Sequence, residues 1–154
     1  MANVKWKPEG IHTITPSFGV EGCAAAIEAY KKVFGAVEKE RYPDPTGKKI
    51  WHAALTIGDS TLYLTDLFPE MGGPAKGGGQ SFWLYVEDAD GTFERAKAAG
   101  FEVRMPMADQ FWGDRSGSVM DRWGNQWTIA KRVKEMTPEE IREAGEEFAR
   151  RQRR

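Results

Sequence analysis

The stretch HAALTIGDSTLYLTD (residues 52–66) alternates apolar and polar side chains on both sides of a glycine. Alternation with a period of two is typical of a β-strand that is buried on one face. The turn that begins at Gly58 favours a hairpin between the two alternating segments. We therefore predict two strands, over residues 50–57 and 61–66, joined by this turn.

A strand and a helix are predicted before the hairpin. Residues 11–20 alternate in the same way, whereas residues 22–34 carry apolar side chains at helical spacing. Gly35 follows at the position where a left-handed residue commonly ends a helix. With one more strand between the helix and the hairpin, the order of this half is β-α-β-β-β.

The second half of the chain repeats this order. An alternating strand over residues 81–86 precedes a helix around residues 89–99, and a further strand and a closing hairpin follow. The hairpin glycines Gly58 and Gly124 lie 66 residues apart, and the glycines that end the two helices lie 65 residues apart. A duplicated unit explains these nearly constant offsets.

We predict one α+β domain over residues 1–154, in which two βαβββ modules form a cupped mixed sheet and a helix follows them. Thr137 and Pro138 supply the N-cap and first position of this C-terminal helix, and Glu140 completes a capping box. The predicted segments are the first module (11–69), a glycine-rich linker (70–80), the second module (81–134) and the C-terminal helix (137–152).

The composition indicates a soluble globular protein. The chain is 40% hydrophobic and 29% charged, with a net charge of −1. That charge leaves no basic field for a nucleic acid, and no apolar run reaches the roughly 20 residues that span a bilayer. Cys23 is the only cysteine, and the first ten residues do not read as a signal peptide. We expect a cytoplasmic protein without nucleic-acid or membrane partners.

Paired βαβββ modules resemble the glyoxalase, bleomycin-resistance and extradiol-dioxygenase superfamily, also called the vicinal oxygen chelate superfamily. The string FWGDRSGSVMDRWGNQWTIA (111–130) is similar to the closing hairpin of its PhnB-like branch. The helix end YKKVFGA (30–36) and the hairpin at residues 52–66 extend the resemblance over nearly the whole chain. The resemblance implies a small-molecule ligand and a homodimer, because relatives complete or cover their cups with a second subunit.

Catalytic members of that superfamily hold a divalent metal at four inward-facing positions filled by His, Glu or Gln. Matching on helix spacing and hairpin turns places those positions on Thr15, Tyr63, Ser81 and Thr128. None of these side chains is a good ligand for zinc, nickel or iron, which bind imidazole, thiolate or carboxylate groups. We therefore expect no metal cofactor.

Strand alternation assigns a lining to the cup independently of the resemblance. Leu62 and Leu64 face the helix, so their odd-numbered neighbours face the cup. Aromatic rings there would stack on a planar ligand, and hydroxyl and amide groups would pair with its polar edge; alternatively, the hydroxyls merely face solvent. The predicted ligand-binding residues are Thr15, Ser17, His52, Tyr63, Thr65, Ser81, Trp83, Tyr85, Arg115, Gln126 and Thr128.

Few residues are candidates for chemistry. His52 is a weak candidate for a general base, with an ordinary hydrogen-bonded histidine as the alternative, whereas His12 is predicted to face the helix. Asp114 and Arg115 are placed in a loop, either as an ion pair that fixes it or with Arg115 as a clamp for a carboxylate or phosphate. Cys23 has no evident partner that would activate its thiol.

The sequence therefore favours a small-organic-molecule-binding protein of this superfamily that sequesters a drug or metabolite without a metal. The alternative is a metal-dependent lyase, isomerase or dioxygenase with an atypical ligand set such as His52, Glu87 or Asp66, so enzymatic activity is left open. A third reading is a structural or regulatory protein with an unoccupied cup.

Overall fold

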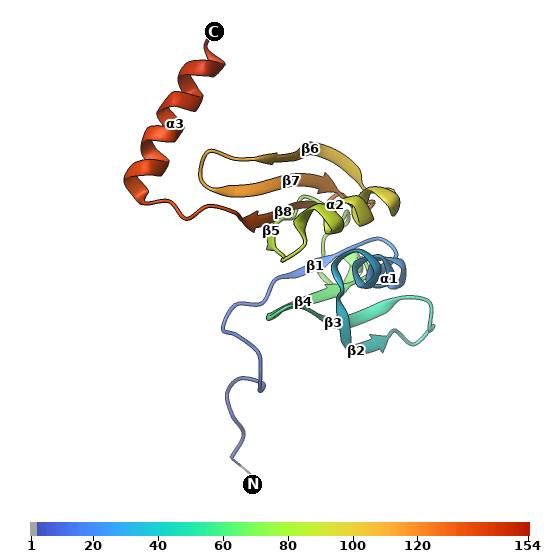
Figure 1. Ribbon diagram of the computed structural model, residues 1–154. Helices are drawn as coiled ribbons and strands as arrows, with labels where there is room; N and C mark the ends of the chain where they lie inside the picture. The colour runs from blue at the N-terminus through green and yellow to red at the C-terminus, as the bar shows by residue number, and fades with distance from the viewer. Residues whose placement is uncertain (1–2) are drawn as a thin grey trace. The chain divides into compact units, whose positions relative to one another are not determined.

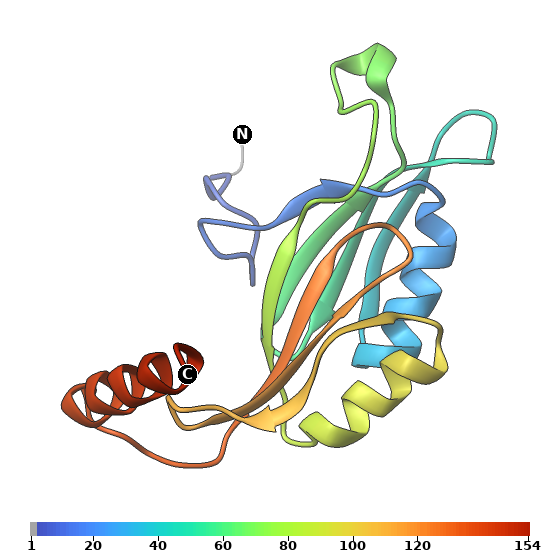
Figure 2. The same ribbon diagram turned by 90° about the horizontal axis from the view of Figure 1, so that it is seen from above.

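The computed structural model describes residues 3–154, which divide into two compact units, one ending at Gly78 and the other spanning Gly79–Arg154. Each unit contains a four-stranded mixed sheet and a helix against one of its faces (Figures 1 and 2). The predicted α+β fold of two βαβββ modules with a C-terminal helix is confirmed. Within the described residues, no helix is long and apolar enough to cross a membrane.

The first unit has the strand order β1-β4-β3-β2, with β1 parallel to β4 and the other pairs antiparallel. Its elements are β1 (Ser17–Gly19), α1 (Cys23–Phe34), β2 (Val37–Pro43), β3 (Ile50–Ile57), β4 (Ser60–Thr65) and the 3-10 helix η1 (Pro69–Met71).

Helix α1 buries its apolar stripe against the first sheet. Ile27, Tyr30 and Val33 are fully enclosed, and Leu62 and Leu64 of β4 are buried beneath them. The predicted orientation of these leucines is therefore correct. Because successive side chains of a strand alternate between faces, Tyr63 lies on the opposite, open face of the sheet.

The second unit has the equivalent order β5-β8-β7-β6, with β5 parallel to β8. Its elements are β5 (Ser81–Tyr85), α2 (Ala89–Ala98), β6 (Glu102–Asp109), β7 (Asp114–Met120), β8 (Gln126–Arg132) and α3 (Pro138–Gln152). Trp127, Ile129 and Val119 form the core between this sheet and α2. The capping box predicted at Thr137 is present, with Thr137 Oγ1 accepting from the Glu140 amide.

Two details of the predicted strands are wrong. Strand β1 covers only Ser17–Gly19 of the predicted residues 11–20, since Pro16 has no amide hydrogen and the chain before it leaves the sheet. His12 consequently lies exposed in the N-terminal segment before β1 and does not face the helix. Asp114 and Arg115 lie within β7 and not in a loop, because they pair with Arg132 and Lys131 of β8.

Candidate functional site

The face of the second sheet that points away from α2 carries large exposed aromatic side chains. Trp83 is 52% exposed and Tyr85 is 60% exposed. Both lie on β5 two positions apart, so they share a face, while Phe82 between them packs on buried Trp127 at a ring distance of 4.5 Å. Thr128 and Ser118 lie opposite Trp83 on the neighbouring strands.

A buried carboxylate fixes two of the rings on this face. Asp114 is only 3% exposed, and its Oδ2 accepts a hydrogen bond from the Tyr85 hydroxyl at 2.8 Å and another from the Trp112 indole at 2.9 Å. The ring of Trp112 lies 6.1 Å from that of Trp83. We call Trp83, Tyr85 and Trp112, with Asp114 behind them, the aromatic face.

The hydrogen bond to Asp114 also acts on the chemistry of Tyr85. It is the main cause of a pKa raised above the ordinary value for tyrosine, and desolvation adds to it. Tyr85 therefore remains a neutral phenol near pH 7, with its hydroxyl donated to the carboxylate. The ring is held in place before any ligand arrives, which lowers the conformational entropy lost on binding.

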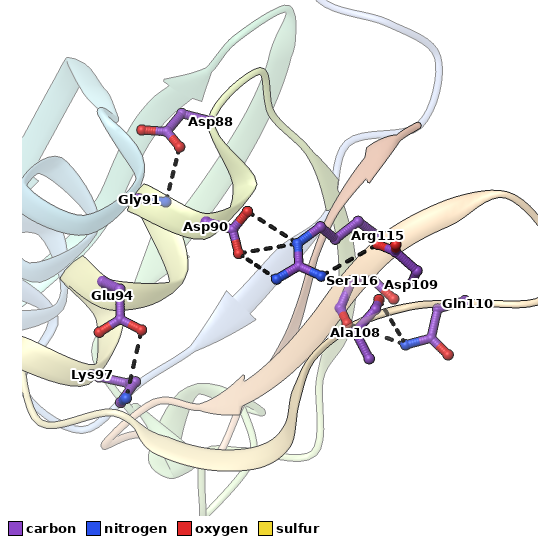
Figure 3. A network of polar contacts seen from close by, with 10 residues as sticks. All are labelled: Asp88, Asp90, Gly91, Glu94, Lys97, Ala108, Asp109, Gln110, Arg115 and Ser116. Carbon is purple, nitrogen blue, oxygen red and sulfur yellow. Dashed lines mark hydrogen bonds and ion pairs between the residues drawn. The ribbon is translucent and has the colours of Figure 1, made fainter. Parts of the chain in front are cut away.

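The remaining residues predicted for the second module separate into two groups. Ser81 and Gln126 lie opposite each other at the start of β5 and β8, on the same side of the sheet as Trp83 and Thr128. Arg115 lies on the other side, where its guanidinium binds the Asp90 carboxylate of α2 at 2.9 Å and Asp109 at 3.3 Å (Figure 3).

The position of Arg115 corrects the prediction that it lines the ligand site. Its neighbour Asp114 faces the aromatic rings, and alternation along β7 turns Arg115 toward α2. The two aspartates raise the pKa of the guanidinium, with Asp90 as the larger cause, and Arg115 in turn lowers the pKa of Asp90. Arg115 thus joins α2 to the sheet, although not through the Asp114 pair considered from the sequence.

The open face of the first sheet carries a smaller cluster around His52. The imidazole stacks on Tyr42 at 6.0 Å and meets Tyr63 edge-on at 4.7 Å. Its Nε2 lies 3.5 Å from a carboxylate oxygen of Glu40. These neighbours fix the orientation of the imidazole ring by packing.

An open hollow of about 370 Å³ lies beside this cluster, a volume within the range of small-molecule sites. Its lining includes Thr56, Thr61 and Tyr63 from the sheet and residues 8–11 from the N-terminal segment before β1.

Of the residues predicted in the first module only Tyr63 lines this hollow, and three more lie outside it besides His52. Ser17 is exposed beside Tyr63 in the strand register. The Thr65 hydroxyl donates to the carbonyl oxygens of Ile50 and Asp66, which is a structural role. Thr15 lines a separate hollow near His12.

The residues at the positions matched to the family's metal site do not fit a divalent cation. In the strand register Tyr63 is paired with Ser17, and Thr128 is paired with Trp83. The neighbours of these two matched positions therefore offer a hydroxyl and an indole, and neither is an imidazole, thiolate or carboxylate ligand. Asp66, considered as an atypical metal ligand, accepts hydrogen bonds from three backbone amides, so both of its carboxylate oxygens are already engaged. Across residues 3–154, no three His, Cys, Asp or Glu side chains gather closely enough to hold a metal ion.

Several residues of these faces were not predicted. Trp112 and Asp114 were assigned to a loop, although alternation extended back from Ser116 would have placed Asp114 on the face of Trp83. Tyr42 and Glu40 lie on β2, a strand whose sequence, VEKERYP, has no clear apolar alternation. Only the pairing of β2 with β3 brings them beside His52.

Two mixed sheets, each covered by a helix on one face and open on the other, define a small α+β protein with two candidate binding faces. The profile of the Glyoxalase/Bleomycin resistance protein/Dioxygenase superfamily matches residues 10–129. The chain belongs to this superfamily.

Several individual proteins are similar to this chain. A protein from Mycobacterium bovis, Mb0911c, is 41% identical over 138 residues, which are 85% of this chain and 90% of that protein. Protein PA1353 from Pseudomonas aeruginosa is similar in structure, with a TM-score of 0.64 and 27% identity over 78% of this chain and 97% of its own. TioX from Micromonospora sp. ML1 has a TM-score of 0.62 and 24% identity over 82% of this chain and all of its own, a likeness that concerns the fold alone.

Proposed function

We propose that this protein binds a small, planar organic molecule on its aromatic face and sequesters it without a metal. The observation that carries the proposal is that Trp83 and Tyr85 are half exposed while buried Asp114 fixes the rings of Tyr85 and Trp112. Exposed aromatic surface is costly in water, and rigid rings stack on a planar ligand with little loss of freedom. The sequence similarity at residues 111–130 supports placement in the PhnB-like branch as part of the same proposal.

Polar groups beside the aromatic face would set the selectivity for a ligand. Gln126 and Thr128 offer an amide and a hydroxyl on the same side of the second sheet as Trp83. A planar heteroaromatic ring with a polar substituent at its edge matches this combination of aromatic rings and neutral hydrogen-bonding groups. We further propose a cytoplasmic homodimer, as the family resemblance implies.

A substitution at Trp83 tests the stacking surface. A thermal-shift screen with planar heteroaromatic probes, such as quinoline-2-carboxylate and 9-aminoacridine, should identify a compound that raises the melting temperature. Trp83→Ala should weaken binding of that compound by about 1–3 kcal/mol, roughly 5- to 150-fold in Kd. Trp51→Ala is the matched control, because Trp51 is also about half exposed, at 45%, but lies on β3 of the other unit. Alternation along β3 turns its side chain away from the open face that carries His52.

Equal affinity of wild type and Trp83→Ala would remove the aromatic face from the ligand site.

Metal content tests the other part of the proposal, which is binding without a metal. Protein dialysed against a weak chelator should contain less than stoichiometric zinc, nickel and iron by mass spectrometry. A stoichiometric metal that survives dialysis would support the alternative of a metal-dependent lyase, isomerase or dioxygenase.

A further inference from the structure

The C-terminal helix α3 presents an apolar stripe that its own unit covers only in part. Ile141, Ala144, Gly145 and Phe148 recur at positions i, i+3, i+4 and i+7 and therefore share one side of the helix. Every residue of α3 is exposed or half-buried, and Phe148 is 47% exposed. Within its unit, the helix stands away from the sheet at the end of the segment that follows β8 (Figures 1 and 2).

Phe111 holds α3 to the β6–β7 turn. Its ring lies 5.3 Å from that of Phe148, and a Cβ atom added at Gly145 would lie 3.2 Å from the Phe111 ring. Phe111 also contacts Trp112 of the aromatic face at a ring distance of 5.0 Å. Ile141 lies about two turns before Phe148 and is half-buried, so α3 is held at Phe111 but its apolar stripe is incompletely covered.

Local interactions keep α3 helical in this exposed position. The capping box closes its first turn, and Arg142 is paired with Glu139 and Glu146. Glu147 pairs with Arg150 and Arg151 near the other end, and these arginines lower the pKa of Glu147. A helix of 15 residues is only marginally stable in water without tertiary packing, so the apolar stripe favours a partner.

The charges of α3 are divided between its two halves. Residues 138–145 contain three glutamates and one arginine, whereas residues 146–154 contain two glutamates and four arginines. The first half is therefore acidic and the second half basic by the same amount. Two copies of such a helix attract each other when they run antiparallel, because each acidic half then lies against a basic half, and repel each other when they run parallel.

The apolar stripe has the same symmetry as the charges. When two copies cross antiparallel about the middle of α3, Ile141 faces the exposed part of Phe148 of the partner subunit, and Ala144 lies near the crossing point, because the Phe111 ring already lies against Gly145. The small side chain of Ala144 allows the two helices to approach closely. A twofold axis makes both sides of such an interface equivalent.

We propose that α3 is a dimerisation helix, which pairs antiparallel with α3 of a second copy of this chain. The inference rests on the homodimer of the proposed function and assigns its surface. Two short helices bury an area at the low end of specific interfaces, so the expected dimer is weak and dissociates at low protein concentration. Its charge pairing makes association weaker in high salt.

Charge reversal on the full chain tests this pairing by sedimentation equilibrium. The variant Glu139→Lys/Glu143→Lys makes both halves of α3 basic, and Arg150→Glu/Arg151→Glu makes both halves acidic. Each variant alone should be monomeric where wild type is dimeric, while an equimolar mixture of the two should form a heterodimer. Glu70→Arg, a change on the exposed η1 helix of the other unit, should dimerise as wild type does.

Circular dichroism shows whether both charge variants keep the helical content of wild type. If either variant loses helical content, Phe148→Ser provides a second test of the α3 pairing. That substitution should raise the dissociation constant at least about tenfold. Variants that stay dimeric, or a mixture that stays monomeric, would overturn the α3 inference and leave the homodimer on another surface. A monomeric wild type at all concentrations would overturn the homodimer as well, whereas ligand binding is tested separately at Trp83.

Discussion

Asp66 joins helix α1 to the first sheet through three backbone hydrogen bonds. Its Oδ1 accepts from the amides of Gly22 and Cys23 at 3.0 Å each, and its Oδ2 accepts from Ile50 at 2.7 Å. Asp66→Ala should lower the free energy of unfolding by about 2–4 kcal/mol, because buried amides lose a charged acceptor. Urea denaturation measures this change.

Asp59 provides the control for that substitution. It is exposed, and its carboxylate accepts a hydrogen bond from the neighbouring Ser60 hydroxyl at 3.2 Å. Asp59→Ala should change the free energy of unfolding by no more than about 0.5 kcal/mol. Equal stability of the two variants would show that Asp66 does not anchor α1.

Cys23 makes the stability of the protein sensitive to alkaline pH. Burial is the main cause that raises the pKa of its thiol from 9.0 to about 12, and the nearby Asp66 carboxylate adds to it. Between these values the unfolded chain loses the thiol proton while the folded chain keeps it. The contribution of Cys23 is therefore fully present below pH 9 and declines by about 1.4 kcal/mol per pH unit above it.

Cys23→Ala isolates this effect from the other groups that titrate at high pH. Urea denaturation of both proteins from pH 8 upward should show a steeper loss of stability in wild type than in the variant. The native thiol should also resist alkylation at pH 8 until the protein unfolds. Parallel pH profiles for the two proteins would contradict the raised pKa.

At the scale of single elements, strand β7 and helix α2 approach each other at a glycine. A Cβ atom added at Gly117 would lie 2.9 Å from the Met105 carbonyl oxygen, the Met107 amide nitrogen and the Phe93 ring. Gly117→Ala should therefore lower the free energy of unfolding by about 1–3 kcal/mol, since backbone and a packed ring must move. Thermal or urea denaturation measures the loss.

The adjacent position on β7 is a control with the opposite expectation. Ser118 is 4% exposed, and its hydroxyl has no hydrogen-bond partner among residues 3–154. Ser118→Ala should leave stability unchanged or raise it slightly, because an unpaired buried hydroxyl is removed. If Gly117→Ala is as stable as Ser118→Ala, the close approach of β7 and α2 is not limiting.

At the scale of the whole molecule, the chain passes from the first unit to the second within the glycine-rich segment 70–80. The boundary between Gly78 and Gly79 lies within it, and Lys76 beside this boundary is exposed. Limited trypsin digestion should cut after Lys76 earlier than after Lys48 or Lys49, because those lysines belong to a turn held by hydrogen bonds of Asp44.

Mass spectrometry of the fragments over time identifies this cut, and Lys76→Gln should remove it. Trimming of the arginine-rich end after α3 is expected in both proteins. An earlier cut in the turn at residues 44–49 would show that segment 70–80 is held more firmly than its glycines suggest.

The sequence alone determined the order of elements and the assignment of side chains to the faces of most strands. Alternation in residues 50–66 and helical spacing in residues 22–34 are local consequences of burying one side of an element, so both can be predicted without the fold. The same holds for α3, whose capping box lies within four consecutive residues. The predicted face of Trp83 and Tyr85 follows from the same alternation.

Only the tertiary structure decided which side chains meet. Asp114 binds Tyr85 across 29 positions of sequence, and Arg115 binds Asp90 across 25. From the sequence, both Asp114 and Arg115 were expected in a loop. Pairing of β7 with β8 makes them part of a strand, which turns one toward the rings and the other toward α2. Contacts between distant segments depend on strand order and register, which local patterns do not contain.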